Sequence, residues 1–95
     1  MHRYIALIRF TDQGAKDIAQ STQRAEIFDA AAKEAGVTIE GQYWTVGSYD
    51  GVLIIRSDRE GKVLRCLAEL VADGNVRTQM LKAFDSAEFK SILTV

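Results

Sequence analysis

The strongest candidate for a chemical site is the segment 42–51, which reads Gln-Tyr-Trp-Thr-Val-Gly-Ser-Tyr-Asp-Gly. It holds the only Trp and two of the three Tyr residues of the chain, next to a turn bracketed by glycines. An aromatic wall with a few polar groups is typical of small-molecule sites, so the segment predicts a ligand pocket. The candidate ligand-binding residues are Tyr43, Trp44, Tyr49, Asp50, Arg77 and Thr78.

Asp50 and Tyr49 are the best candidates for catalytic residues. If Asp50 is partly buried, its carboxyl pKa rises toward the range of a general base, and Tyr49 can donate a phenolic hydrogen bond. A structural interpretation is the more common one: Asp50 accepts N–H groups of its own turn while the Tyr49 ring packs on a helix. The sequence leaves both interpretations open, because the carboxylate has no identified catalytic partner.

The other candidate residues also have two interpretations each. Arg77 and Thr78 could bind a carboxylate or phosphate group of a ligand, since Arg supplies a two-pronged donor and Thr a hydroxyl. The alternative is a structural ion pair of Arg77 with Asp50 or Glu40. Trp44 could line a pocket, or it could fill the core or a subunit interface, where large amphipathic rings are favoured.

The sequence predicts no cofactor and no metal site. Gly47 and Gly51 neither match a phosphate-binding loop nor open a helix. His2 is the only His, and it has no neighbouring ligand residues of the kind that a zinc site needs. Cys66 is the only Cys and lies in a helical pattern, so a buried, reduced thiol is expected.

Length and composition predict a single domain over residues 1–95, because a chain of this size supports one hydrophobic core. With 12 basic and 13 acidic side chains, no surplus of positive charge is available to neutralise a nucleic-acid backbone. No apolar run approaches the ~20 residues of a membrane span, and no secretory cleavage site is apparent. We therefore expect a cytoplasmic protein that binds neither nucleic acid nor membrane.

Hydrophobic periodicity predicts four strands, over residues 3–10, 37–46, 51–56 and 76–84. The first and third strands carry apolar residues on both faces, as expected of central strands. In the second strand, simple alternation places Ile39 and Tyr43 on one face and Trp44 on the other.

Two longer helices and one short helix lie between and after these strands. The first ends before Gly36 and the second before Gly74, because glycine tolerates the left-handed conformation that follows a helix. Asp58 is the expected N-cap of the second helix, and Asp85 that of the short C-terminal helix. The expected buried stripes are Phe28, Ala31, Ala32 and Ala35 on the first helix, and Leu64, Leu67, Ala68 and Val71 on the second.

The order βαββαβ in fewer than 100 residues predicts an α+β, ferredoxin-like fold with a four-stranded antiparallel sheet and a short C-terminal helix. Both helices then cover one face of the sheet. Leaving several apolar side chains of the other face in water forfeits several kcal/mol at ~25 cal/mol per Å². We therefore expect a homodimer or a larger homo-oligomer that covers the open face.

Three segments carry a family resemblance: the Tyr-Trp-Thr-Val-Gly-Ser-Tyr-Asp run, with Gly47, Tyr49 and Asp50 as its signature, the junction 74–78 and the closing segment 81–84. Through them the chain resembles the GYD domain family over nearly its whole length. The resemblance implies a ferredoxin-like domain of the dimeric α+β barrel type and implies no particular reaction.

Three functions are consistent with these features. The leading hypothesis is an accessory homodimer that binds a small organic molecule between sheet and helices. The first alternative is a cofactor-free or haem-associated oxygenase, or an isomerase, with Asp50 and Tyr49 as catalytic residues. The second alternative is a structural assembly module without a ligand site.

Overall fold

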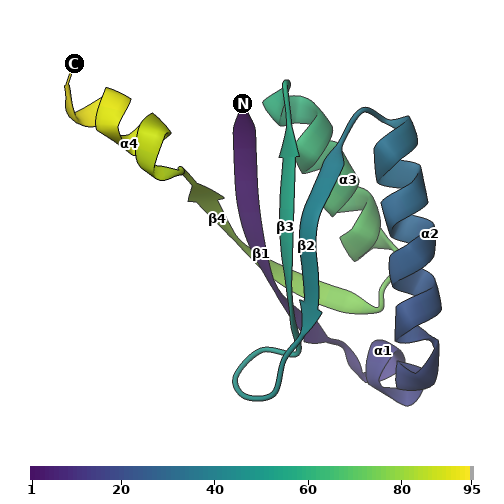
Figure 1. Ribbon diagram of the computed structural model, residues 1–95. Coiled ribbons are helices and arrows are strands. Elements are labelled where there is room, and N and C mark those ends of the chain that lie inside the picture. Colours follow the sequence, from purple (N-terminus) through teal and green to yellow (C-terminus); the bar gives the residue numbers. More distant parts are fainter. Residues whose placement is uncertain (95) are drawn as a thin grey trace.

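The computed structural model describes residues 1–94 and contains one sheet with its two longer helices on one face (Figure 1). The order of elements follows the predicted βαββαβ pattern, with a short extra helix before α2 and a terminal helix after β4. The elements are β1 (His2–Phe10), α1 (Asp12–Lys16), a 3-10 turn (Ile18–Gln20), α2 (Ser21–Glu34), β2 (Thr38–Trp44), β3 (Gly51–Ser57), α3 (Glu60–Ala72), β4 (Val76–Ala83) and α4 (Ser86–Leu93).

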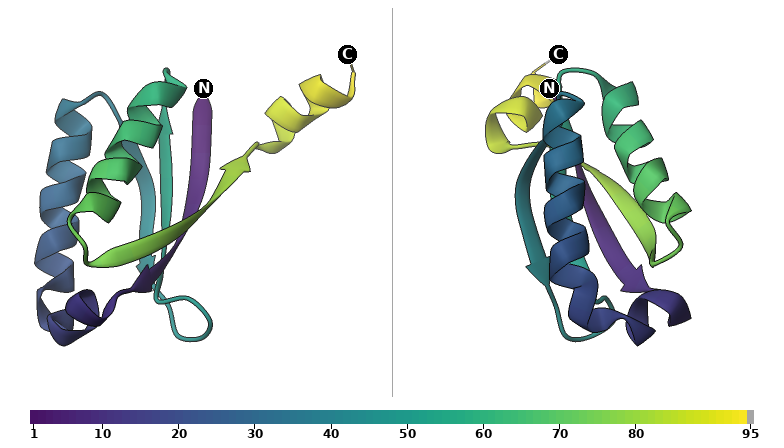
Figure 2. Two further views of the ribbon diagram at one scale, coloured as in Figure 1. Left: turned by 180° about the vertical axis from the view of Figure 1, so that it is seen from behind. Right: turned by 90° about the vertical axis from the view of Figure 1, so that its right-hand side faces the viewer.

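The strands form an antiparallel sheet in the order β2-β3-β1-β4, so β1 and β3 are the central pair, as predicted. Their register places Ala6 opposite Leu53 and Ile5 opposite Ile54. This topology is the ferredoxin-like α+β fold. Figure 2 shows α2 and α3 on the same side of the sheet and α4 on the other side.

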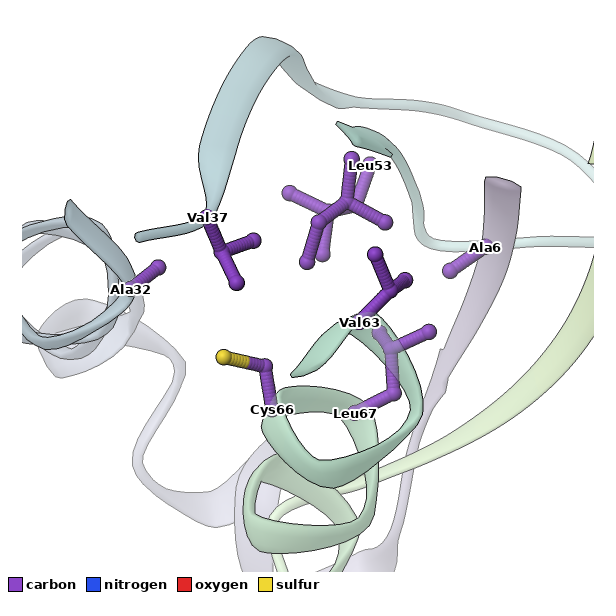
Figure 3. Packing of buried hydrophobic residues seen from close by; sticks show 8 residues of the cluster. Ala6, Ala32, Val37, Leu53, Val63, Cys66 and Leu67 are labelled. Carbon is purple, nitrogen blue, oxygen red and sulfur yellow. The ribbon is translucent and has the colours of Figure 1, made fainter. Parts of the chain in front are cut away.

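The hydrophobic core lies between the sheet and the two long helices (Figure 3). Leu53 and Ile55 of β3 are fully buried, as are Ala6 of β1 and Val63 of α3. Along β3, buried residues alternate with half-buried ones, so one face of this strand is sealed and the other is only partly covered. Free Cys66 is buried in the same cluster, as expected, and burial raises the pKa of its thiol.

The buried side of α3 differs from the predicted stripe. The helix buries Val63, Cys66 and Leu67, with Leu70 packed against them, whereas Leu64 is 39% exposed. Val63 begins the same i, i+3, i+4, i+7 pattern one residue earlier, so the predicted period was right and its phase was wrong.

Both long helices depart from the prediction in other details. Asp58 is not the N-cap of α3: Arg59 occupies that position without a side-chain cap, and Asp58 instead accepts from the Ser57 hydroxyl at 3.1 Å. In α2 only Ala32 is fully buried and Phe28 packs against the core, whereas Ala31 and Ala35 of the predicted stripe are exposed. Gly36 and Gly74 follow their helices with positive φ, as predicted.

A bulge in β2 corrects the predicted alternation of that strand. The register with β3 shifts between Ile39 and Gly41, so Glu40 is an extra residue. Ile39 therefore packs against the core, whereas Gly41 and Tyr43 lie on the opposite, open face. The prediction assumed strict alternation of side chains along the strand, and that assumption cannot reveal a bulge or the change of face that it causes.

The open face of the sheet carries two apolar rows between charged ends. One row runs across all four strands as Gly41, Ile54, Ile5 and Leu81, and the next contains Val52 and Leu7. Ile5, Leu7, Val52 and Ile54 are half-buried in the single chain, and Leu81 is 44% exposed.

Helix α4 projects from the end of β4 toward the side of the open face (Figure 2). Asp85 caps it as predicted, within a reciprocal capping box in which Glu88 accepts from the Asp85 N–H. Glu88 also pairs with Arg3 of β1 at 2.6 Å. The apolar side chains Phe84, Phe89, Ile92 and Leu93 of this arm are all between 47% and 70% exposed.

Candidate functional site

A cavity of about 570 Å³ lies on the helix side of the sheet, between α2, α3 and the strands. Its apolar walls come from Ile8 and Phe10 of β1, Phe28 of α2 and Leu70 of α3, and Trp44 lies at the end of β2. On α2, Ser21, Arg24, Ala25 and Ile27 border the cavity, and Ala32 near the end of the helix is buried in the core.

Trp44 and Asp50 are the two predicted site residues that this cavity brings together through their side chains. The Trp44 indole N–H donates to the Ser21 hydroxyl at 3.2 Å, which joins the end of β2 to the start of α2. Tyr43 also borders the cavity, but its ring lies over Gly41 on the open face.

Asp50 fastens the loop between β2 and β3 to the end of β1. Its carboxylate accepts the Phe10 N–H at 2.8 Å, and its own N–H donates to the Ile8 carbonyl at 2.8 Å. The Thr45 N–H donates to the Asp50 carbonyl at 2.9 Å. The carboxylate thus holds a neighbouring strand, whereas the structural interpretation of the sequence expected it to hold its own turn.

Tyr49 lies on the other side of the sheet from the cavity. Its ring lies beneath the Arg9 guanidinium, with 4.7 Å between Arg9 Cζ and the ring centroid, and its hydroxyl donates to Gln79 Oε1 at 2.6 Å. The ring therefore does not pack on a helix. Tyr49, Arg77 and Thr78 border a second, smaller hollow, so the predicted ligand residues divide between two places.

The expected ion pair of Arg77 with Asp50 or Glu40 does not form. Glu40 pairs instead with Arg3 at 2.7 Å and lies 3.0 Å from Arg56 Nε, at the other end of the open face. Within residues 1–94, no carboxylate lies within 4.0 Å of the Arg77 guanidinium.

A separate polar cluster surrounds Glu60 at the start of α3. Its carboxylate accepts from Lys82 Nζ at 2.7 Å and from the Tyr4 hydroxyl at 2.9 Å. The Lys82 ammonium, followed by the Tyr4 hydroxyl, lowers the pKa of Glu60, and the bond to Glu60 raises the pKa of Tyr4. These groups satisfy one another and join β1, α3 and β4, so we interpret the cluster as structural.

No group of three or more His, Cys, Asp or Glu residues with metal-binding geometry occurs in the part of the chain that the structure describes. Across the same residues, no helix is both long enough and apolar enough to cross a membrane.

Sequence reasoning missed several residues of the two hollows. Phe10, Phe28 and Leu70 line the cavity, but in the sequence they resemble ordinary core residues. Arg9 borders the smaller hollow with Arg77, and the two become neighbours only through the pairing of β1 with β4. An explicit strand register is the signal that could have found the arginine pair.

The contacts of Asp50 predict a structural effect of its removal. Asp50→Ala leaves the Phe10 N–H without its acceptor, and a hydrogen bond to a charged group contributes about 2 kcal/mol. Asp50→Asn keeps a carbonyl oxygen and should lose less than half as much. Urea denaturation measures both effects, with exposed Asp29→Ala as the control. Equal stability of wild type and Asp50→Ala would contradict this structural role of Asp50.

The fold and the cavity define a small ferredoxin-like α+β domain with a hollow between its sheet and helices. The family model of the GYD domain matches residues 4–93, and the chain belongs to that family. Gly47, Tyr49 and Asp50, on which the sequence resemblance was based, therefore lie in the loop that separates the two hollows.

Two comparisons with proteins from Thermus thermophilus agree with this assignment. The chain is 29% identical over 89 residues to the glutamine synthetase and cystathionine beta-lyase binding protein of that organism, covering 93% of this chain and 94% of the relative. It is similar in fold to the crystal structure of TTHA0845 from the same organism, with a TM-score of 0.58, 22% identity, and coverage of 90% and 96% of the two chains.

Proposed function

We propose that this protein is a non-catalytic, homodimeric accessory protein that binds a small organic molecule in the cavity beside Trp44 and Asp50. The observation that carries the proposal is the cavity itself, whose volume of about 570 Å³ falls in the range of ligand sites. Its walls are mainly aromatic and aliphatic, with few polar groups, as such sites require.

Charge at the cavity favours a neutral or cationic ligand. Its lining includes the acidic residues Asp50, Glu69 and Asp73 and one basic residue, Arg24, and the Glu69 carboxylate is paired with Arg65 at 3.2 Å. Arg24 already donates to the Asp17 carbonyl at 3.0 Å. A ligand with an apolar body and an amino or hydroxyl group satisfies this lining better than an anion does.

The homodimer is supported by the open face. Its two apolar rows leave half-buried aliphatic side chains in contact with water in the single chain, and a second copy of the same face would cover them. Helix α4 lies on that side of the sheet (Figure 2), and its Phe89 and Ile92 side chains are 50% and 48% exposed. The resulting assembly would be a dimeric α+β barrel, and we infer a cytoplasmic location for it.

The name of the Thermus relative favours a second role, the binding of other proteins. That relative is described as a binding protein for two enzymes, and it matches nearly the whole of this chain. An accessory subunit whose ligand state controls its binding to an enzyme would combine this role with the cavity.

An enzymatic function has less support from the geometry. The catalytic hypothesis required Asp50 and Tyr49 to act on one substrate, but Asp50 borders the cavity and Tyr49 borders the smaller hollow. The Asp50 carboxylate also accepts a backbone N–H. A structural module without a ligand site would not require a cavity of this size.

Fluorescence of Trp44 tests the ligand proposal directly, because it is the only Trp and it borders the cavity. A thermal-shift screen of neutral and cationic metabolites should find a stabilising compound, which should then change the Trp44 emission saturably. Ala25→Phe, at the cavity wall on α2, should lower the affinity at least tenfold. Ala30→Phe, on the exposed side of the same helix, is the control. No stabilising compound, or equal affinity in both variants, would contradict the proposal.

A further inference from the structure

Arg9 and Arg77 form a pair of like charges at one end of the open face. They are directly opposite each other in the register of β1 and β4. Side chains in that relation have their Cβ atoms ~5 Å apart, and like charges there destabilise a sheet. A fold gains nothing from this arrangement unless another group neutralises it.

Nothing in the described chain neutralises the pair. Among residues 1–94, neither guanidinium has a carboxylate within 4.0 Å, whereas Arg3 and Arg56 at the other end of the face both pair with Glu40. Both Arg9 and Arg77 are exposed to solvent. The open face is thus electrically balanced at one end and carries two uncompensated positive charges at the other.

Neighbouring side chains hold this end in a defined shape. The Tyr49 ring supports the Arg9 guanidinium, and its hydroxyl donates to Gln79 Oε1 on β4. Because that bond occupies the Gln79 oxygen, the amide NH₂ of Gln79 is left as a donor. The Thr45 hydroxyl donates to the Tyr49 carbonyl at 2.6 Å and fixes the loop that carries the ring.

Together these groups border a hollow of about 230 Å³, formed by Leu7, Arg9, Tyr49, Arg77, Thr78 and Gln79. Two guanidinium forks and one amide supply hydrogen-bond donors, and no carboxylate contributes. Strand alternation directs the Thr78 side chain to the other face, so Thr78 borders the hollow mainly through its backbone.

We propose that this hollow is an oxyanion site that binds the phosphate or carboxylate group of a small molecule between Arg9 and Arg77. Arginine binds such groups with two parallel hydrogen bonds, which a planar carboxylate or a phosphate matches. Tyr49 is a positioning residue: its ring holds the Arg9 guanidinium. The site is distinct from the cavity beside Trp44, whose lining carries a net negative charge and lies on the opposite face.

The test uses inorganic phosphate and succinate as probes, titrated against sodium chloride at matched ionic strength. NMR signals of Arg9, Arg77 and Tyr49 should shift saturably with at least one probe and not with chloride. Arg77→Gln should lower the affinity at least tenfold, and Arg77→Lys, which keeps the charge but loses the fork, should also lower it. Tyr49→Leu should lower it about two- to fivefold, the expected effect of an exposed cation–π contact. Arg65→Gln removes a charge from the exposed surface of α3 and should change nothing.

The melting temperature distinguishes a binding role of the arginine pair from a structural one. In buffer without either probe, Arg77→Gln should melt at the same temperature as the wild type or higher, because it relieves the repulsion from Arg9. A lower melting temperature would show that the pair is structural and would overturn the proposal. Equal responses of Arg77→Gln and Arg65→Gln to the probes would do the same.

Oligomeric state provides the remaining readout. If neither anion binds and Arg77→Gln weakens self-association, a carboxylate of a second copy occupies the hollow, and the small-molecule site is excluded. Binding of a neutral ligand beside Trp44 should be unchanged in Arg77→Gln. The proposals for the two hollows can therefore fail independently.

Discussion

Leu53→Ala should lower the free energy of unfolding by about 3 kcal/mol, because it removes a fully buried side chain from the centre of the core. Leu53 lies on a central strand, opposite Ala6, where neighbouring strands limit the collapse of the resulting space. For a domain of this size 1 kcal/mol corresponds to about 4–8 °C, so the melting temperature should fall by roughly 15 °C. Thermal and urea unfolding followed by circular dichroism measure this loss.

Leu64→Ala makes the same chemical change on α3 at a side chain that is 39% exposed. It should cost less than about 1 kcal/mol, because much of that side chain already contacts water. The comparison also tests the phase of α3, since the sequence pattern had placed Leu64 in the core. Similar losses in both variants would show that α3 buries its other side.

The topology could be predicted because local patterns specify it. The continuous apolar run of β3 and the glycines after each long helix identify the elements, and a βαββαβ order in a short chain permits few arrangements. The phase of α3 could not be predicted in the same way. Apolar residues from Val63 to Val71 cover most of its circumference, so two stripes that share Leu67 fit equally well. Only the position of the sheet decides between them.

The candidate site illustrates a second limit. Tyr49 and Asp50 are adjacent in the sequence, which suggested one site, but in the loop their side chains go to different partners. Tyr49 reaches Gln79 on the open face, and Asp50 reaches the Phe10 N–H at the cavity. Both contacts join residues at least 30 positions apart, so the sequence provides the residue types but not their partners.

Contacts between distant segments also explain why the loop 45–50 is so rich in hydrogen bonds. Through Asp50 it fastens β1, and through Tyr49 it reaches β4. Two consecutive residues therefore hold the loop to both faces of the sheet.

Ile54→Lys should convert the proposed dimer into a monomer while the fold persists. Ile54 is next to Leu53 but points to the open face, where it lies opposite Ile5 and Gly41 in the central apolar row. In the single chain its side chain is half-buried, so a lysine can extend its ammonium into water. In a dimer the same ammonium would lie without a partner between two apolar surfaces, which costs several kcal/mol. The dissociation constant should rise at least about 30-fold, as measured by analytical ultracentrifugation.

The matched control is Ile27→Lys, because Ile27 is 63% exposed on α2, away from the open face. It makes the same change of side chain and of net charge, so any general effect of charge on association appears in both variants. Dimers of Ile27→Lys together with monomers of Ile54→Lys would locate the interface on the sheet. If the wild type sediments as a monomer of about 10.5 kDa at micromolar concentration, the dimer proposal is wrong, and the apolar rows require another partner. That partner would then have to present an apolar surface to the same two rows, because exposure of these rows to water is unfavourable.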